Sequence, residues 1–361
     1  MARVSGVTAR AVALAACIAA VAACGPGPES SAGPAGGPRV SGPVASVTVA
    51  AGGSGGPGAP LGTLSKYADA VDAAHRHGLA VWLEADLVSR WLQGPTALAA
   101  GVGRLADLSR HPGVVGVKIA DELGEDDGLG SPARVLAFLD DAAVALRPAL
   151  PPGTQILVDV VVPELGCVPG DAEVAQLRAA CVARVRERWP GATLASIDAV
   201  VRSGDVDAVD VSTGLLDGGQ YVEWGLTTEQ AQRAAWAEID RRGWAGLVTV
   251  RARKAMAVPA PYPTAAAAAA ALPTFVDAPV AGGARAVDIW TWRQHYDGTT
   301  VGLMSSGLRP NALWDGLLAR HARGVELLTH LSPSLLQRGL DADLAQVARV
   351  FSGVFLATGT G

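Results

Sequence analysis

The sequence predicts a (β/α)8 barrel of the TIM type, an α/β fold in which eight parallel strands alternate with helices. Short apolar, β-branched runs alternate with helical patterns along most of the chain, and the connections between them are short. With 361 residues, half of them hydrophobic and 17% charged, the chain has enough material for one large core.

The predicted elements alternate regularly behind an N-terminal region rich in Gly and Pro. The strands are expected at residues 44–50, 79–86, 114–119, 154–162, 206–212, 246–253 and 285–292. The helices are expected at residues 67–77, 96–110, 132–147, 171–189, 194–201, 228–242, 265–271, 311–323 and 340–357.

The N-terminus has the pattern of an export signal. Arg3 and Arg10 precede an apolar run over residues 11–23 that is too short to span a bilayer. Val-Ala-Ala-Cys24 resembles the lipobox of an actinobacterial-type lipoprotein, in which the Cys is acylated, and Cys17 fits less well because it would halve the apolar run. An ordinary signal peptide, leaving a soluble secreted protein, is the alternative.

The N-terminal pattern sets the expected domains and location. We expect a lipoprotein signal peptide over residues 1–24, a Gly/Pro/Ser-rich linker over 25–40 and the barrel over 41–361. The expected place is outside the cytoplasm, held to the cell membrane by the lipid anchor, or secreted if the anchor is absent.

The cysteines and the charge limit which disulfide, partners and cofactors can be expected. Cys167 and Cys181 remain after the signal, and in an oxidising setting they predict a disulfide, with two free thiols as the alternative. The net charge of −5, with Lys and Arg scattered, argues against nucleic acid as a partner. No Cys-x-x-Cys and no strand-borne His pair occurs, so neither a metal nor another cofactor is expected.

The most informative stretch is the strand at 114–119, which ends at Asp121 and Glu122. In a barrel, the C-terminal ends of the strands carry the catalytic groups, although this acidic pair would also serve to cap the next turn. The stretch resembles strand four of the retaining (β/α)8 glycoside hydrolases, which ends in Asn-Glu. The resemblance implies that Glu122 is the general acid/base, that Asp121 stands at the Asn position, and that the ligand is a carbohydrate.

This resemblance covers roughly residues 67–324 and sets the expected register of the barrel. It makes residues 79–86 strand three and residues 286–292 strand eight, with strands one and two irregular or incomplete because only about forty residues remain for them. In the alternative register, residues 44–50 form strand one and residues 326–330 form strand eight. We favour the first, because Trp290 and Trp292 resemble the strand-eight tryptophan of those enzymes.

Carboxylates and arginines at other strand ends complete the predicted site. Glu84 or Asp210 is expected to act with Glu122 as the second catalytic carboxylate, and the side chains expected to contact substrate are Asp86, Asp121, Asp159, Trp82, Arg251, Arg253, Trp290, Trp292 and His295. Core packing is the alternative for the tryptophans, and an arginine-paired network is the alternative for the carboxylates.

The sequence departs from the resembling family at one point. No carboxylate occurs between Gly246 and Pro273, where the family has its nucleophilic Glu, and Arg251 and Arg253 occupy this strand instead. Three interpretations remain: a reassigned or inverting site, a site whose arginines bind an anionic sugar, or a barrel that binds carbohydrate without catalysis. The sequence therefore predicts an exported, lipid-anchored protein resembling glycoside hydrolases and leaves open whether it is an enzyme.

Overall fold

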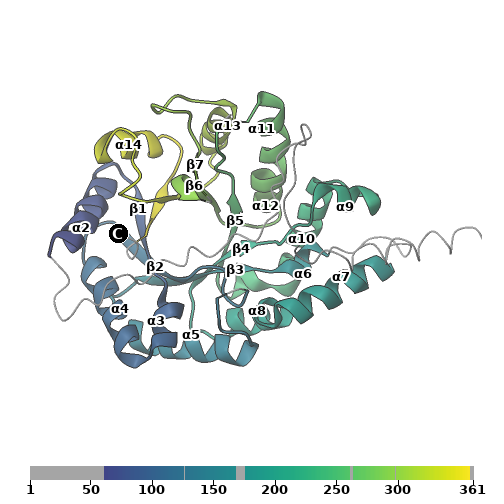
Figure 1. The fold of residues 1–361 in the computed structure, drawn as a ribbon, viewed down its shortest axis with the longest axis horizontal. Coiled ribbons are helices and arrows are strands. Elements are labelled where there is room, and N and C mark those ends of the chain that lie inside the picture. Colours follow the sequence, from purple (N-terminus) through teal and green to yellow (C-terminus); the bar gives the residue numbers. More distant parts are fainter. Residues whose placement is uncertain (1–60, 126, 168–174, 261–262, 297, 358–361) are drawn as a thin grey trace, which may run out of the picture. The chain divides into compact units, whose positions relative to one another are not determined.

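Eight parallel strands close into a barrel in the computed structural model, which confirms the predicted fold class (Figure 1). The strands are β1 (Ala80–Glu84), β2 (Val114–Ala120), β3 (Gln155–Val161), β4 (Ala208–Ser212), β5 (Thr249–Ala255), β6 (Val287–Tyr296), β8 (Leu327–Leu331) and β9 (Gly353–Ala357). Each pairs with the next, and β9 pairs with β1 to close the ring. Strand β7 (Thr299–Gly302) is antiparallel to the far end of β6.

The structure describes residues 61–125, 127–167, 175–260, 263–296 and 298–357. These residues all belong to one compact unit, residues 43–361. The predicted signal peptide, Cys24, the linker and the strand expected at 44–50 lie outside the described residues.

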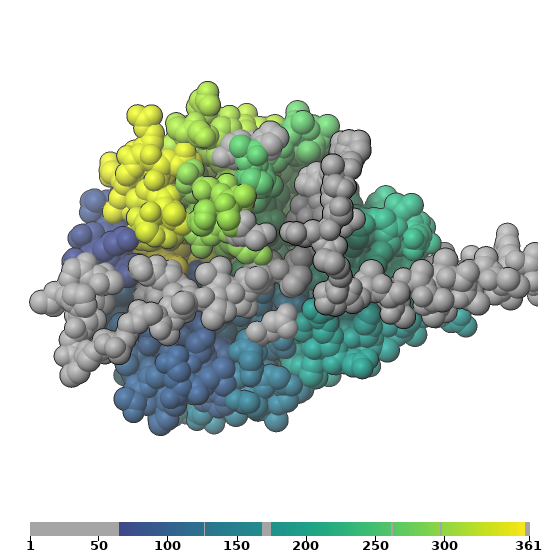
Figure 2. Space-filling model, in the orientation of Figure 1, coloured from purple at the N-terminus to yellow at the C-terminus, as the bar shows by residue number. Residues whose placement is uncertain are grey.

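Helices surround the barrel in the order that the alternating pattern predicts. They are α2 (Leu61–Arg76), α3 (Leu87–Gln93), α4 (Pro95–Leu108), α5 (Pro132–Leu146), α6 (Pro163–Gly166), α7 (Ala175–Arg188), α8 (Leu194–Arg202), α9 (Gly218–Glu223), α10 (Thr228–Arg242), α11 (Ala265–Leu272), α12 (Ala278–Ala281), α13 (Ala312–His321) and α14 (Leu340–Val347). The first and last, α2 in purple and α14 in yellow, lie side by side (Figure 2). No described helix is both long and apolar enough to cross a bilayer.

Local sequence explains where these helices begin and end. Helix α10 starts at a capping box in which Thr227 and Gln230 satisfy each other's backbone N–H groups, and it ends at Gly243, whose φ of 69° suits a residue without a Cβ. Similarly, the side chain of Ser131 caps α5, which has Pro132 at its first position.

Both registers proposed from the sequence are wrong. The first barrel strand is β1, at Ala80–Glu84, and the eighth is β9, at Gly353–Ala357. The helix expected over residues 340–357 stops at Val347, and the chain then enters β9. Since β9 is buried on both faces, it reads as a continuous apolar run, and periodicity does not separate such a run from a buried helix.

Apolar side chains form the floor of the barrel interior. Trp82, Leu157, Ala208, Ala286, Leu328 and Phe355 make up this cluster. A Cβ at Gly116 would lie 2.2 Å from an atom of the Trp82 ring, so the indole fits only because position 116 is glycine. Towards the C-terminal ends of the strands, the interior becomes charged, whereas barrels are usually filled there by Val, Ile and Leu.

Candidate functional site

Charged side chains from seven of the eight barrel strands meet inside the barrel. They are Glu84 (β1), Lys118 (β2), Asp159 (β3), Asp210 (β4), Arg251 and Arg253 (β5), Asp288 (β6) and His330 (β8). Side chains alternate between the two faces of a strand, so one inward position on each strand places these groups at similar heights. All of them are buried except Glu84, whose side chain is 19% exposed.

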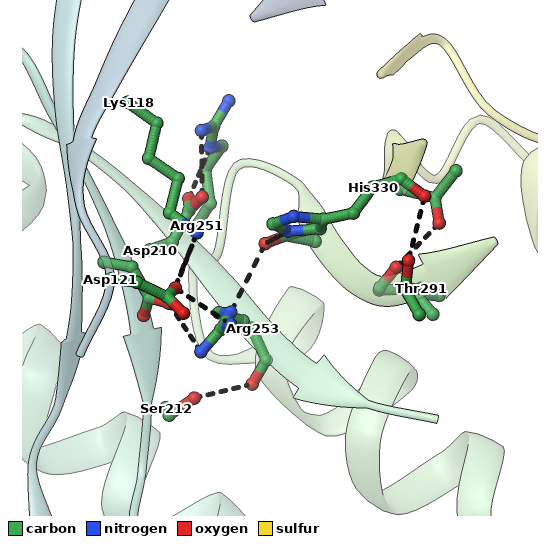
Figure 3. A network of polar contacts seen from close by, with 12 residues as sticks. Lys118, Asp121, Asp210, Ser212, Arg251, Arg253, Thr291 and His330 are labelled. Atoms are coloured by element: carbon green, nitrogen blue, oxygen red, sulfur yellow. Dashed lines mark hydrogen bonds and ion pairs between the residues drawn. The ribbon is translucent and has the colours of Figure 1, made fainter. Parts of the chain in front are cut away.

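Six charged groups form a closed ring in which the sign alternates. Its members, in order, are His330, Glu84, Lys118, Asp121, Arg253 and Asp288. Figure 3 shows Lys118 from β2, Asp121 from the end of the same strand, Arg253 from β5 and His330 from β8. We call this set the charge ring.

One half of the charge ring is centred on the ammonium group of Lys118. Its Nζ donates to Glu84 Oε1 at 2.9 Å and to Asp121 Oδ1 at 2.7 Å. The side chain of Lys118 is fully buried, while that of Asp121 is 46% exposed at the strand end. The two carboxylates raise the pKa of Lys118 although burial lowers it, so the ammonium group stays charged.

The other half is centred on the guanidinium group of Arg253. Its Nη2 lies 3.0 Å from Asp121 Oδ1, and its Nε lies 3.7 Å from Asp288 Oδ2. The backbone carbonyl of Arg253 lies 3.5 Å from the hydroxyl of Ser212, which donates to it (Figure 3). These contacts hold one arginine against carboxylates from two other parts of the barrel.

His330 joins the two halves. Its Nδ1 lies 2.9 Å from Glu84 Oε2, and its Nε2 lies 2.9 Å from Asp288 Oδ2. Burial disfavours the imidazolium, but Asp288 and Glu84 outweigh it and raise the pKa of His330 to about 9. Burial likewise disfavours the Glu84 carboxylate, yet Lys118 and His330 lower its pKa to about 2.

Two further carboxyl groups, Asp159 and Glu122, lie beside the ring and share the guanidinium group of Arg253 with it. Arg253 Nη1 is 2.5 Å from Asp159 Oδ2 and 3.5 Å from Glu122 Oε1. Burial raises the pKa of Glu122 to about 7 against the opposing charge of Arg253, and it raises the pKa of Asp159 well above its ordinary value. Both groups therefore hold a proton more readily than an ordinary carboxyl does.

Glu122 also has an unusual backbone. Its φ of 50° lies in the left-handed region, which a residue with a Cβ occupies at a cost of roughly 1 kcal/mol. The turn places its carboxyl at the C-terminal end of β2, where the side chain is 6% exposed. Strained residues of this kind cluster at functional sites.

Asp210 and Arg251 form a separate pair below the ring. Arg251 donates from Nε to Asp210 Oδ1 at 2.6 Å and from Nη2 to Asp210 Oδ2 at 3.1 Å. The guanidinium group lies 4.4 Å from the centre of the Trp82 ring, which forms the floor. Asp210 is thus occupied by a cation and has no exposed surface.

The charges of the interior balance only if protons are counted. The ring holds three cations and three carboxylates, and Asp210 balances Arg251. Asp159 and Glu122 are then in excess, so the cluster is neutral when these two are protonated. A buried cluster favours low net charge, which explains why these two carboxyls have raised pKa values.

The structure brings together seven of the predicted residues in the charged interior: Glu84, Asp121, Glu122, Asp159, Asp210, Arg251 and Arg253. Asp86 instead caps α3 by accepting from the backbone N–H of Ser89. Trp82 is in the floor, at the opposite end of the barrel from Glu122.

The remaining predicted aromatic and histidine residues lie on β6. Trp292 is buried in the outer core, and its indole N–H donates to Asp343. Trp290 is partly exposed and makes an edge contact with Tyr296, while His295 is exposed beyond it.

Sequence reasoning missed three members of the ring: Lys118, Asp288 and His330. Lys118 and His330 are each the single charged residue of a mainly apolar strand, and Asp288 stands between apolar residues at the start of β6; this is the signal that could have found them. The predicted disulfide between Cys167 and Cys181 is confirmed, with a Cα–Cα distance of 5.8 Å. Within the described residues, no group of three or more His, Cys, Asp or Glu side chains has an arrangement that could hold a metal ion.

Comparison with models of protein families and with curated proteins finds no match. Solved structures similar to this chain include a phosphonomutase-like protein from Burkholderia cenocepacia (13% identity, 82% of this chain and 91% of that chain, TM-score 0.40). They also include 2,3-dimethylmalate lyase of the PEP mutase/isocitrate lyase superfamily (14%, 82% and 81%, TM-score 0.35) and a β-glucosidase (14%, 82% and 77%, TM-score 0.33). At such identities the likeness is one of fold alone.

The predicted glycoside hydrolase function, whether catalytic or limited to carbohydrate binding, is wrong. The site itself lacks the second carboxylate that the mechanism requires, because β5 carries Arg251 and Arg253, while ion pairs occupy Glu84 and Asp210. The fold was predicted correctly, and the chemistry inferred by analogy with it was not.

Proposed function

We propose that this protein is an enzyme that transfers protons by general acid–base catalysis at the C-terminal mouth of the barrel. The observation that carries the proposal is the Glu122 carboxyl, which lies at the strand end, 3.5 Å from Arg253, with its pKa raised to about 7. An acid whose pKa is close to neutral both gives and takes a proton readily, and such a group typically contributes about 10²–10⁴ in rate.

The neighbours of Glu122 have separate roles in this proposal. Asp121 is held ionised by Lys118 and Arg253 and is half exposed, so it offers a substrate a hydrogen-bond acceptor. Arg253 faces Glu122 and stabilises its ionised form after the proton has left. Asp159 is fully buried and does not reach a substrate, and we assign it to the balance of charge behind Arg253.

Deuterium incorporation tests this function without assuming a particular product. The purified protein is incubated in D₂O with a panel of small carbonyl compounds, hydroxy acids and amines, and mass spectrometry detects exchange at carbon. We expect exchange into at least one compound, and we expect Glu122→Gln to reduce its rate at least a hundredfold.

A matched variant serves as the control for a general effect of removing a carboxyl group. Glu229→Gln removes a carboxyl from an exposed ion pair on α10 and is expected to leave the exchange rate unchanged. Exchange that survives Glu122→Gln would remove Glu122 from the proposed role. No exchange into any compound, in protein that is folded, would count against proton transfer at carbon.

We also propose that the chain is exported and lipid-anchored through Cys24. The pattern of residues 1–24 supports this, and so does the disulfide between Cys167 and Cys181, which is stable in oxidising compartments. Mass spectrometry of the mature N-terminus after expression in a bacterial host tests it. A diacylated Cys24 is expected, and Cys24→Ala should release the protein from membranes, whereas a mature terminus without lipid would contradict the anchor.

A further inference from the structure

We propose that His330, with both ring nitrogens protonated, is a positioning residue of this site: it closes the charge ring and thereby holds Lys118 and Arg253 against Asp121. The inference rests on the proposed acid–base function, because it assigns His330 a role toward the groups that surround Glu122. His330 does not contact Glu122 or the mouth directly, so its action passes through the ring.

Both nitrogens of the His330 imidazole face carboxylates. Each of its two nitrogens is 2.9 Å from a carboxylate oxygen, one on Glu84 and one on Asp288. An ionised carboxylate only accepts hydrogen bonds, so both nitrogens must donate, and the ring carries a positive charge. A neutral imidazole would leave one nitrogen lone pair facing a carboxylate oxygen inside the barrel.

Packing and backbone hydrogen bonds fix the orientation of the His330 imidazole. Its ring stacks on Phe355 with centroids 4.7 Å apart, and the side chain is 8% exposed. The backbone carbonyl of His330 accepts from the Thr291 hydroxyl at 3.0 Å (Figure 3), and the neighbouring Thr329 hydroxyl donates to the carbonyl of Ile289. The bridge between Glu84 and Asp288 therefore has one orientation.

Charged groups from several strands surround His330. From β1 it meets Glu84, from β6 Asp288, and from β2, at longer range, Lys118, which opposes its charge. From β9 it meets only the Phe355 ring. From β5, Arg253 lies 3.7 Å from the same Asp288 oxygen. Two carboxylates thus contact His330 directly, while the cations Lys118 and Arg253 lie beyond these carboxylates in the ring, which keeps the imidazole protonated.

The consequence lies at the two cations of the ring. Glu84 contacts both His330 and Lys118, and Asp288 contacts both His330 and Arg253. If His330 loses its charge, Glu84 and Asp288 are left in a buried site with one cation fewer, and one of them must take up a proton. Lys118 or Arg253 then loses an ionised partner and is free to turn away from Asp121.

Nitrogen NMR of the full chain tests the protonation of His330 without any variant. At pH 7 both ring nitrogens of His330 are expected to be protonated, and this signal should persist to about pH 9. One unprotonated nitrogen at pH 7 would overturn the inference, whether or not any variant folds.

The variant His330→Gln tests the positioning role. We expect a carboxyl that titrates in the neutral range to appear in its carbon NMR spectrum, in addition to Glu122. We also expect solvent exchange of the Arg253 Nε–H to become at least tenfold faster. The matched control is His77→Gln, which breaks a surface pair with Asp341 and should change neither signal.

The two proposals fail in distinguishable ways. If Glu122 titrates near pH 7 in the native protein but His330→Gln leaves Arg253 exchange unchanged, the positioning role fails and the proposed function stands. If Glu122 does not titrate near pH 7 in the native protein, the proposed function fails, even where His330 has both nitrogens protonated.

Discussion

At the scale of single residues, Glu122 combines two costs that a purely structural residue would avoid. Its carboxyl is buried and shares the Arg253 guanidinium group with three aspartates, and its backbone has a φ of 50°. Burial of an ionised acid and left-handed backbone both reduce stability. Residues that carry such costs are commonly those on which activity depends, and their replacement often stabilises the protein.

Glu122→Gln is therefore expected to stabilise the protein at pH 8. Because the pKa of Glu122 is raised to about 7 from its usual 4.5, its contribution to stability is present below pH 4.5 and is lost as the pH rises through 7. A neutral Gln avoids this loss, so the variant should gain about 1–3 kcal/mol at pH 8 and almost nothing at pH 4. Urea denaturation at both pH values measures the gain, and equal stability at pH 8 would contradict it.

Arg253→Met is expected to destabilise the barrel strongly. It leaves Asp121, Asp159 and Asp288 without the guanidinium group that all three approach, and removal of one partner from a buried ion pair costs about 3–5 kcal/mol. Arg233→Met is the control, because it breaks an exposed pair with Glu229 and should cost less than about 1 kcal/mol. Denaturation curves of the two variants measure these losses in the free energy of unfolding. Similar losses in both variants would refute the special role of Arg253.

At the scale of elements, the sequence predicted most strands and helices because their periodicity and end signals are local. The strand at 114–119 matches β2, and the helix at 228–242 matches α10 to the residue. The strand β9 was missed because a run that is apolar on both faces carries no period. The order of the strands around the barrel was predicted from a family resemblance. Only the position of β9 in the structure corrects it.

The disulfide links α6 to α7, two elements whose connection is long for this fold. Replacing Cys167 and Cys181 together by Ala should lower the free energy of unfolding by about 3 kcal/mol, as expected for a closed loop of about 15 residues. Denaturation of the native protein with and without reductant, beside the double variant, measures this. If reductant destabilises the double variant as much as the native protein, the loss does not arise from the disulfide.

At the scale of the whole molecule, the charge ring ties five barrel strands together across the interior. The sequence indicated that carboxylates gather at the strand ends, because their position follows from strand alternation. It did not indicate which cation each carboxylate meets, since partners such as Glu84 and His330 are far apart in the chain. The sequence could therefore give only a list of candidate residues for the site. That Lys118 and His330 face inward and meet these carboxylates could be seen only in the closed barrel.

The ring predicts how stability depends on pH. The pKa of His330 is raised to about 9 from 6.5, so its contribution is full below pH 6.5 and is lost between pH 6.5 and 9. The pKa of Glu84 is lowered to about 2 from 4.5, so its contribution is full above pH 4.5 and is lost as the pH falls to 2. Each amounts to about 3 kcal/mol.

Calorimetry of the native protein and of His330→Gln across this range separates the two contributions. The difference in unfolding free energy between them should be largest below pH 6.5 and should shrink toward pH 9, because the native histidine then loses its charge. The Glu84 contribution should appear in the native protein as a loss of stability below pH 4.5. A difference that stays constant from pH 6 to 9 would show that His330 is not charged in the native protein.

A carbon NMR titration of the side-chain carboxyls shows whether the proton on Glu122 exchanges near neutral pH, as the proposed acid–base role requires. Glu122→Gln assigns the resonance by its disappearance. We expect this resonance to titrate near pH 7. A titration at the ordinary value of a glutamate would contradict the account and leave the charged interior of the barrel as a structural feature only.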